Sequence, residues 1–432
     1  MGVEPTYAAW EAAVLPMNYS REPVRYYTRP FSEMQHEKCR GMNCPDRTYT
    51  VPLLQGGMDM KRFLTALCAA LLLSTSAGAL EVSAPAAVLM EKETGTVLYE
   101  KDAHAKLEPA SVTKVMTLLL TMEAIDAGQL RYDTVITASA HACSMGGSQI
   151  WLEENEQMTV DDMLKAVCVV SANDCAVALA EAVAGSEEAF VEKMNQRAAE
   201  LGMNDTTFKN ATGLPAEGHV TSAWDIALMS RELILNHPDI RNYTTIWMDS
   251  LRGGKSELVN TNKLIRFYEG ATGLKTGSTD SALYCLSGTA ERDGMELIAV
   301  IMKAPTSAQR FDDAKALLNY GFSTYSLETI VPQEALPPVP VELGTQATVQ
   351  PVLGDGATLL LEKAKASQLS QAVTLADTVA APVALGDVLG TLTVTAGEET
   401  VAQIPIVAGE SVDRITFSQM FTRLLRTAFL GG

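Results

Sequence analysis

Histidine is scarce in this chain, which holds only 5 in its 432 residues. The four beyond residue 80 do not stand in a pattern with acidic and serine partners: His104, His141, His219 and His237. A Ser-His-Asp catalytic triad is therefore not indicated. Zinc-binding cysteine spacing is also lacking, because Cys39 and Cys44, near His36, have no second pair to complete a site. We expect neither a metal ion nor an organic cofactor.

Basic residues are in deficit. The chain has 33 lysines and arginines against 52 aspartates and glutamates, which gives a formal net charge of -19 at pH 7. A surface of this sign repels nucleic acid, and no basic stretch with interleaved aromatic residues stands out. We therefore expect no nucleic-acid partner. A hydrophobic content of 47% and a length sufficient for two or three domains are typical of a globular protein.

A long membrane-spanning run is missing near the N-terminus, where the apolar run Phe63–Leu73 is too short to cross a bilayer. It follows the basic Met60-Lys61-Arg62 and precedes Ala77-Gly78-Ala79, which fits a signal-peptidase site. This pattern predicts a signal peptide over residues 60–79, a mature chain from Leu80 and an exported protein.

The first 59 residues are rich in Pro, Tyr, Arg and Met and lack periodicity. A signal peptide that begins sixty residues into a chain is unusual. Our hypothesis is that translation starts at Met58 or Met60 and that the upstream stretch is over-extended. The alternative is a genuine but disordered extension.

Three short motifs follow one another in a fixed order: Ser111-Val112-Thr113-Lys114, Ser171-Ala172-Asn173 and Lys275-Thr276-Gly277. Ser-x-x-Lys, Ser-x-Asn and Lys-Thr-Gly, in this order, form the active-site set of enzymes that react with penicillin. Each motif occurs by chance in chains of this length. The ordered set is far more specific than any of its members.

The first motif has the spacing of an activated serine. Residues three apart share one face of a helix, so Ser111 at a helix start presents its hydroxyl to the amine of Lys114. The apolar run after Lys114 predicts a buried helix, and burial favours a neutral lysine that accepts a proton. Backbone N–H groups at the helix start suit an oxyanion. The alternative is an ordinary buried helix with a capping serine.

The second and third motifs offer partners for that serine. Ser171 in a loop between helices could relay a proton, and Asn173 could hold a substrate amide; helix capping by Ser171, Asn173 and Asp174 is the alternative. Lys275 and Thr276 on a strand edge suit a carboxylate, and Gly277 allows close approach to a ligand. A solvated lysine in a glycine-rich hairpin is the alternative there.

The chain resembles the low-molecular-mass penicillin-binding proteins, the serine D-alanyl-D-alanine carboxypeptidases, over roughly residues 82–330. The resemblance rests on the three motifs and on these flanks: Glu108-Pro109-Ala110-Ser111, Met145-Gly146-Gly147-Ser148-Gln149, Asn210-Ala211-Thr212-Gly213-Leu214, Thr261-Asn262-Lys263-Leu264 and Gly273-Leu274-Lys275-Thr276-Gly277. Two positions depart from the family pattern. Thr272 stands where many members carry Asp, and Val220 where an aromatic residue is usual after the histidine.

The resemblance implies a function and a set of roles. Ser111 would be acylated by the penultimate D-Ala of a peptidoglycan stem pentapeptide, the terminal D-Ala would leave, and water would hydrolyse the acyl-enzyme. The implied roles are as follows: Lys114 as proton acceptor, Ser171 as second catalytic hydroxyl, Asn173 for the substrate amide, Lys275, Thr276 and Gly277 for the carboxylate end, the N–H groups of Ser111 and Ser278 for the oxyanion, and Arg310 as a further carboxylate contact. β-Lactam antibiotics would act as inhibitors.

Two other functions are weighed against this one. A class A-like β-lactamase shares the three motifs and needs a deacylating Glu-x-x-Leu-Asn, which Glu232-Leu233-Ile234-Leu235-Asn236 matches. That string lies in a helical pattern that begins at Ala223 and stands too near Lys275. A non-catalytic penicillin-binding wall protein is disfavoured because the reactive residues are intact.

The expected fold class is α+β, with one antiparallel sheet flanked by helices, β-lactamase/transpeptidase-like, followed by a small all-β sandwich domain. The catalytic domain is assigned to residues 80–330. Its expected elements are a hairpin of strands 86–90 and 96–99, helices to about 236, strands 283–286 and 297–302, and a helix 310–320.

Prolines 332, 337, 338 and 340 mark a linker or edge at the start of the C-terminal β-domain, assigned to 331–408. Its expected strands are 345–351, 372–375, 389–395 and 401–407. The segment 409–432 has helical period, with an apolar face that includes Phe417, Phe421 and Leu424. It predicts an amphipathic anchor at the membrane surface, on the outer face of the cytoplasmic membrane or in the cell wall. The alternative is a helix docked on the protein.

Four cysteines remain in the predicted mature chain: Cys143, Cys168, Cys175 and Cys285. An even count in an exported protein allows disulfides. Cys168 and Cys175 lie in apolar runs, which favours a role as small buried hydrophobic residues.

Overall fold

The computed structural model of the protein describes residues 80–430. The predicted signal peptide and the N-terminal stretch lie outside the described residues. A five-stranded antiparallel sheet has the order β2-β1-β9-β8-β7, which places β7 at one edge. Its strands are β1 (Ala86–Glu91), β2 (Val97–Lys101), β7 (Ala271–Thr279), β8 (Leu283–Arg292) and β9 (Met295–Ala304). The predicted α+β class is confirmed.

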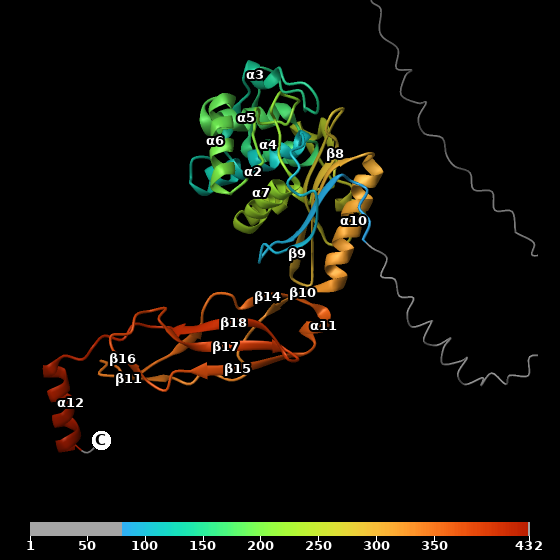
Figure 1. Ribbon diagram of the computed structural model, residues 1–432. Helices are drawn as coiled ribbons and strands as arrows, with labels where there is room; N and C mark the ends of the chain where they lie inside the picture. Colours follow the sequence, from blue (N-terminus) through green and yellow to red (C-terminus); the bar gives the residue numbers. More distant parts are fainter. Residues whose placement is uncertain (1–79, 431–432) are drawn as a thin grey trace, which may run out of the picture. The chain divides into compact units, whose positions relative to one another are not determined.

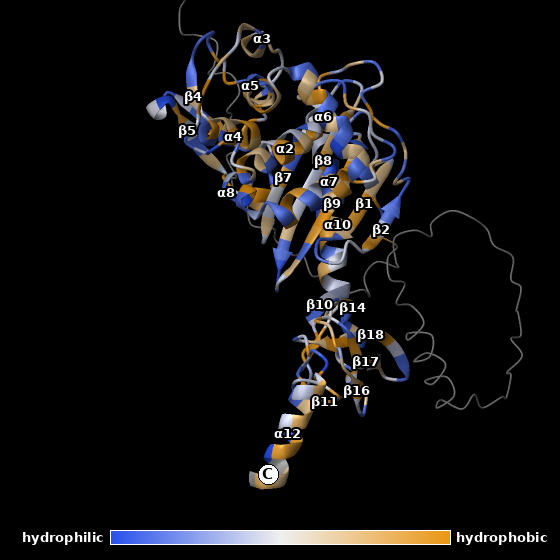
Figure 2. Ribbon diagram, turned by 90° about the vertical axis from the view of Figure 1, so that its left-hand side faces the viewer, coloured by the Kyte–Doolittle hydropathy of each residue, from blue (hydrophilic) through white to orange (hydrophobic). Residues whose placement is uncertain are grey.

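Side chains of the central strands alternate between two buried cores. Val88 and Val300 face the core shared with most of the helices, and Leu89 and Ile301 face the core shared with α10. Figure 1 shows α2, α5 and α7 on one side of the sheet and α10 (Ser307–Thr324) on the other. The apolar colour of β1 and β9 in Figure 2 fits strands that are buried on both faces.

Four of the longer helices in the catalytic part begin at short capping residues. The side chains of Thr159, Ser186, Ser222 and Thr306 each accept a hydrogen bond from a backbone N–H in the first turn. Besides α10, the helices are α2 (Lys114–Asp126), α3 (Ala140–Cys143), α4 (Val160–Val169), α5 (Asn173–Ala184), α6 (Glu187–Glu200), α7 (Ala223–Asn236), α8 (Arg241–Thr244) and α9 (Leu264–Phe267). Short 3-10 turns are η1 (Ala110–Thr113), η2 (Pro238–Ile240) and η3 (Arg252–Gly254).

Two small two-stranded sheets accompany these helices. They are formed by β3 (Val135–Thr137) with β4 (Gln157–Thr159), and by β5 (Met248–Leu251) with β6 (Ser256–Val259). The second is a hairpin that carries η3 between its strands. The sequence patterns predict neither pair, because strands of three or four residues leave no alternation to detect.

The C-terminal part is all-β apart from two helices. One sheet has the order β12-β11-β16 and another the order β13-β18-β17-β15. The strands are β11 (Val339–Glu342), β12 (Thr348–Val349), β13 (Pro351–Leu353), β15 (Leu369–Leu375), β16 (Val379–Ala380), β17 (Val388–Ala396) and β18 (Glu399–Ala408). Residues from both sheets share one core, as the predicted sandwich requires. Strand β10 (Tyr325–Thr329) pairs with β14 (Thr358–Glu362), and α11 spans Lys363–Ala366.

The Pro-rich segment was predicted to be a linker or edge, and part of it is strand β11. Val339 and Val341 are buried while Pro340 is exposed, so the strand keeps an alternating pattern. Its two neighbours pair with different residues, β12 with 339–340 and β16 with 341–342. A proline is tolerated because the pairing is short on each side.

The last helix, α12 (Phe417–Leu430), presents large apolar side chains to solvent. Phe417 is 86% exposed and Phe429 is 81% exposed, and Phe421 and Leu424 are exposed as well. None of the helices between residues 80 and 430 is long and apolar enough to cross a bilayer. An exposed apolar face disfavours the alternative of a helix docked on the protein.

The four cysteines of the described residues are free. Cys168, Cys175 and Cys285 are buried, which confirms the interpretation of Cys168 and Cys175 as small buried hydrophobic residues. Burial raises the pKa of Cys168 to about 12 and that of Cys285 to about 11. Burial also raises the pKa of Cys175 well above its usual value.

Candidate active site

Ser111 lies in a tight turn just before a helix. It belongs to η1, and Lys114 is the first residue of α2. The Lys114 Nζ is hydrogen-bonded to Ser111 Oγ at 3.0 Å, as the three-residue spacing predicts. Ser111 lies at the helix start as predicted, in a 3-10 turn that runs directly into α2 and comes one turn before the α-helix itself.

Lys114 is fully buried. Its Nζ also donates to the carbonyl oxygen of Thr212 at 2.7 Å. Burial holds the pKa of Lys114 well below its usual range, and the charge of Lys275 lowers it further, whereas Asp174 opposes the shift. A lysine in this environment is suited to accept the proton of a neighbouring hydroxyl.

Two glycines allow backbone segments to lie in close contact with the turn Pro109–Val112, which carries Ser111 and is called the nucleophile turn below. A Cβ at Gly277 would lie 2.8 Å from the Pro109 oxygen and 2.9 Å from the nitrogens of Ser111 and Val112. A Cβ at Gly213 would lie 1.9 Å from the oxygen of Ala110. The sequence predicted that Gly277 admits a ligand; the structure shows that it admits the nucleophile turn. Strand β7 therefore passes beside the Ser111 backbone nitrogen, and Ser278 follows directly on that strand.

Lys275 and Thr276 lie on β7 and are buried, so the alternative of a solvated lysine in a hairpin is wrong. The Lys275 Nζ donates to the oxygen of Thr276 at 3.0 Å, and the hydroxyl of Thr276 is 2.7 Å from that of Thr261. Burial lowers the pKa of Lys275 to about 7; Cys168 opposes that shift and Arg310 adds to it. A carboxylate bound here would restore the charged ammonium.

Arg310 lies behind the same strand, on α10. Its guanidinium donates to the carbonyl oxygens of Gly277 and Cys285, each at 3.2 Å. Burial lowers the pKa of Arg310 to about 10. Arg310 therefore supports the backbone of β7 and β8 and adds positive charge near Lys275.

Ser171 and Asn173 each carry a buried polar atom without a partner. Ser171 joins α4 to α5 with a φ of +64°, in the left-handed region that non-glycine residues rarely adopt. Within residues 80–430, Ser171 Oγ and Asn173 Oδ1 have no hydrogen-bond partner. The Asn173 side-chain amide donates to the oxygen of Gly146 at 2.6 Å. Buried polar atoms are normally paired, so these two are available to a bound molecule.

The segment from Gly146 to Leu152 is fixed by the residue that follows the second motif. The buried Asp174 carboxylate accepts from the N–H groups of Ile150 (3.1 Å) and Leu152 (3.0 Å). The Asn173 N–H donates to the oxygen of Ser148 at 2.7 Å. Sequence reasoning treated Asp174 only as a capping residue. An acidic side chain at the start of an apolar helix needs partners when buried, and that was the available signal.

His219 contacts the 3-10 turn that carries Ser111, at Thr113. Its Nε2 is 2.9 Å from the Thr113 hydroxyl, and burial lowers its pKa to about 4. No sequence pattern assigns a role to His219 or to the Thr212 carbonyl, because such contacts depend on tertiary packing alone.

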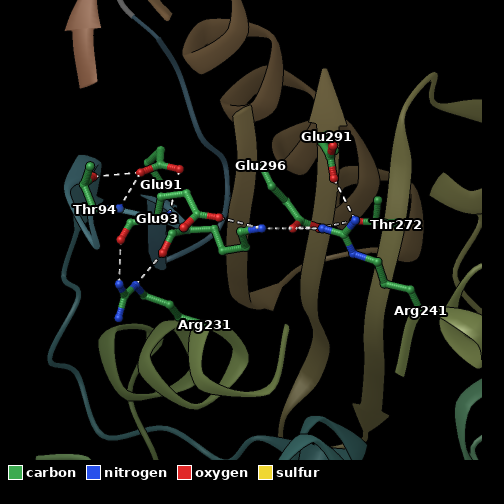
Figure 3. Close-up of polar contacts among 9 residues, drawn as sticks. Glu91, Glu93, Thr94, Arg231, Arg241, Thr272, Glu291 and Glu296 are labelled. Carbon is green, nitrogen blue, oxygen red and sulfur yellow. Dashed lines mark hydrogen bonds and ion pairs between the residues drawn. The ribbon is translucent and has the colours of Figure 1, made fainter. Parts of the chain in front are cut away.

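Thr272, which departs from the family pattern, lies three residues before Lys275 on β7. Its hydroxyl donates to Glu296 Oε1 at 2.7 Å, and the buried Glu296 also contacts Arg241 and Lys92. Figure 3 shows Thr272 and Arg241 on the same side of the Glu296 carboxylate, with Glu291 bound to the same arginine. In this chain Glu296, near the start of β9, supplies a carboxylate beside residue 272, and a threonine at 272 can donate a hydrogen bond to it.

The Glu232–Asn236 string lies at the end of α7, as predicted. Glu232 forms an ion pair with Arg197 at 2.6 Å, which occupies its carboxylate on the helix surface. This arrangement disfavours a deacylating role. Between residues 80 and 430 there is no group of three or more His, Cys, Asp or Glu side chains that could hold a metal ion.

A family profile described as "D-alanyl-D-alanine carboxypeptidase" matches residues 73–306, and one described as "Penicillin-binding protein 5, C-terminal domain" matches residues 325–414. The chain is 39% identical over 383 residues to D-alanyl-D-alanine carboxypeptidase DacF of Bacillus subtilis; the alignment covers 85% of this chain and 98% of that protein.

Two solved structures are similar as well. Penicillin-binding protein 5 of Haemophilus influenzae matches with a TM-score of 0.68 and 28% identity, over 77% of this chain and 98% of that one. Penicillin-binding protein D2 of Listeria monocytogenes, in its ampicillin-bound form, matches with a TM-score of 0.52 and 35% identity, over 56% of this chain and 99% of that one.

Proposed function

The chain belongs to the D-alanyl-D-alanine carboxypeptidase family, and we propose that it removes the terminal D-alanine from peptidoglycan stem pentapeptides through an acyl-enzyme on Ser111. The observation that carries this proposal is the hydrogen bond between Ser111 and a fully buried Lys114. Lys114 takes the hydroxyl proton while Ser111 Oγ attacks the carbonyl carbon of the penultimate D-Ala. The backbone N–H groups of Ser111 and Ser278 stabilise the oxyanion.

The other two motifs protonate the leaving group and bind the substrate peptide and its carboxylate end. Ser171 delivers its hydroxyl proton to the nitrogen of the departing D-Ala and receives in return the proton that Lys114 took from Ser111. Asn173 binds a backbone amide of the peptide. Lys275 and Thr276 bind the free carboxylate, with Arg310 adding charge from behind β7. The unpartnered atoms of Ser171 and Asn173 support these roles. Water then attacks the ester carbonyl and frees Ser111.

The test is release of D-alanine from diacetyl-Lys-D-Ala-D-Ala, with and without penicillin. The wild-type protein should release D-alanine, penicillin should block the release, and Ser111→Ala should abolish it. Release by Ser111→Ala would contradict the mechanism. Penicillin should form a long-lived adduct; rapid penicillin turnover would instead favour a β-lactamase.

The location of the enzyme is a separate proposal. We propose that the protein is exported by residues 60–79 and held at the outer face of the membrane, or in the cell wall, by α12. The exposed apolar face of α12 supports the second step. Deletion after Gly409 should release the protein from membranes while leaving D-alanine release intact, and a truncated protein that stays with membranes would contradict the anchor.

The domain organisation is also a proposal. We assign 1–59 to an over-extended or disordered stretch, 60–79 to the signal peptide, 80–330 to the catalytic domain, 331–408 to the β-domain and 409–432 to the anchor. Because β10 pairs with β14, we move the start of the β-domain from residue 331 to near residue 325.

A further inference from the structure

A cavity of about 710 Å³ opens next to the Ser-x-Asn motif. Its lining includes Val170, the neighbour of Ser171, and Gln149, the neighbour of Ser148. Further lining residues come from η3 and β6 and from Lys255 between them. Its volume lies in the range of pockets that bind small ligands, and none of the roles proposed above uses it.

An arginine from the hairpin fixes one wall of the cavity. The Arg252 guanidinium binds both carboxylate oxygens of Glu156, at 2.7 and 2.9 Å. It also donates to the carbonyl oxygens of Ile150 (2.8 Å) and Trp151 (3.2 Å). Because Asp174 holds the N–H groups on the other side of this segment, its backbone is fastened at both edges. Trp151 is thereby held with a φ of +54° and with 74% of its surface exposed.

Three charged side chains that line the cavity have no partner. Within the described part of the chain, the carboxylates of Glu153 and Glu257 and the ammonium of Lys255 make no side-chain hydrogen bond or ion pair. The Arg252–Glu156 pair is neutral as a unit. The cavity therefore offers one aromatic face, two free carboxylates and one free ammonium. An aromatic face and a carboxylate attract an ammonium group, and an ammonium attracts a carboxylate.

We propose that this cavity binds the side chain of the residue that precedes D-Ala-D-Ala in the stem peptide, and that it selects a side chain ending in an ammonium and a carboxylate together. The inference rests on the proposed function. Asn173 contacts the backbone oxygens of Gly146 and Ser148, and the next residue of that segment, Gln149, lines the cavity. A peptide held by Asn173 therefore brings its preceding residue toward this lining. Trp151 and the two glutamates then receive the ammonium, and Lys255 receives the carboxylate.

Three N-acylated peptides of the form X-D-Ala-D-Ala test this selection. X is meso-diaminopimelate, lysine or Nε-acetyl-lysine, which carry both charges, the ammonium alone, or neither. The value of kcat/KM for D-alanine release should fall in that order, by roughly five-fold at each step. Acylation by benzylpenicillin, which lacks residue X, reports independently on the catalytic machinery.

The variants assign each step to a side chain. Lys255→Ala should remove the preference for diaminopimelate over lysine. The double variant Glu153→Gln/Glu257→Gln should remove the preference for lysine over acetyl-lysine, and Trp151→Ala should weaken it. Glu154→Gln is the matched control, because Glu154 is an exposed neighbour outside the cavity lining. All of these variants should keep the wild-type rate of acylation by benzylpenicillin.

Equal kcat/KM values for the three peptides in the wild-type protein would overturn the inference, provided that benzylpenicillin still acylates Ser111. Preferences that survive in Lys255→Ala and in the double glutamine variant would overturn it as well. A wild-type protein that neither releases D-alanine from any peptide nor forms the penicillin adduct would contradict the proposed function itself.

Discussion

The substitution Gly277→Ala tests whether β7 and the nucleophile turn form one rigid unit. The added methyl carbon would lie 2.8–2.9 Å from three backbone atoms of the Pro109–Val112 turn, about 0.5 Å closer than ordinary contact. Backbone atoms cannot rotate away as a side chain can, so the strand and the turn must separate. A displacement of this size at a reacting centre should lower the rate of acylation roughly 10- to 100-fold.

The assay is the second-order rate of Ser111 acylation by a fluorescent penicillin, measured beside thermal unfolding. Overpacking should also cost about 1–3 kcal/mol of stability. Gly146→Ala is the control, because a Cβ there meets no atom within 4 Å and no positive φ is involved. If Gly277→Ala acylates within two-fold of wild type, strand β7 does not position the nucleophile and the reasoning fails.

Three further predictions concern the second motif, the carboxylate pocket and the start of β7. Ser171→Ala should lower acylation by roughly 10²–10⁴-fold, while its melting temperature stays at or slightly above that of wild type, because the removed hydroxyl has no partner in the described structure; a clear loss of stability would show that the hydroxyl is structural. The kcat/KM for peptides with a free C-terminal carboxylate should fall as pH rises above about 7, where Lys275 loses its charge. Lys114 cannot cause this fall, because the fraction of its neutral, proton-accepting form increases with pH. A peptide with an amidated C-terminus should not show the fall. Thr272→Asp should destabilise the protein by about 1–3 kcal/mol at neutral pH, because it places a carboxylate against Glu296; Thr272→Asn should be milder, and the difference should shrink in acid.

The catalytic residues could be predicted because their spacing carries the chemistry. The distance from Ser111 to Lys114 follows from one helical turn, and the structure differs only in the type of turn. The burial of Lys275 could not be predicted, because β7 is covered by residues far away in the chain. The same holds for Asp174, whose partners are backbone N–H groups, and for Arg252, which binds backbone carbonyls as well as Glu156; no sequence pattern marks these partners.

The fold was predictable where periodicity was strong. Strands β1 and β9 and the helices α7 and α10 were expected within a few residues of their observed bounds. Strand β11 was not expected, because a proline such as Pro340 disfavours a strand unless the pairing with each neighbouring strand is short. The hairpin β5–β6, which forms part of the cavity, was not predicted because each of its strands has only four residues.

The buried thiols bear on how the molecule withstands oxidation. Only the thiolate attacks a disulfide or an alkylating reagent, and the raised pKa values of Cys168, Cys175 and Cys285 keep these groups protonated and out of reach in the folded protein. Unfolding exposes all of them at once. In an oxidising medium these three thiols therefore stay out of wrong disulfides for as long as the protein stays folded, and the rate of unfolding sets how long this protection lasts.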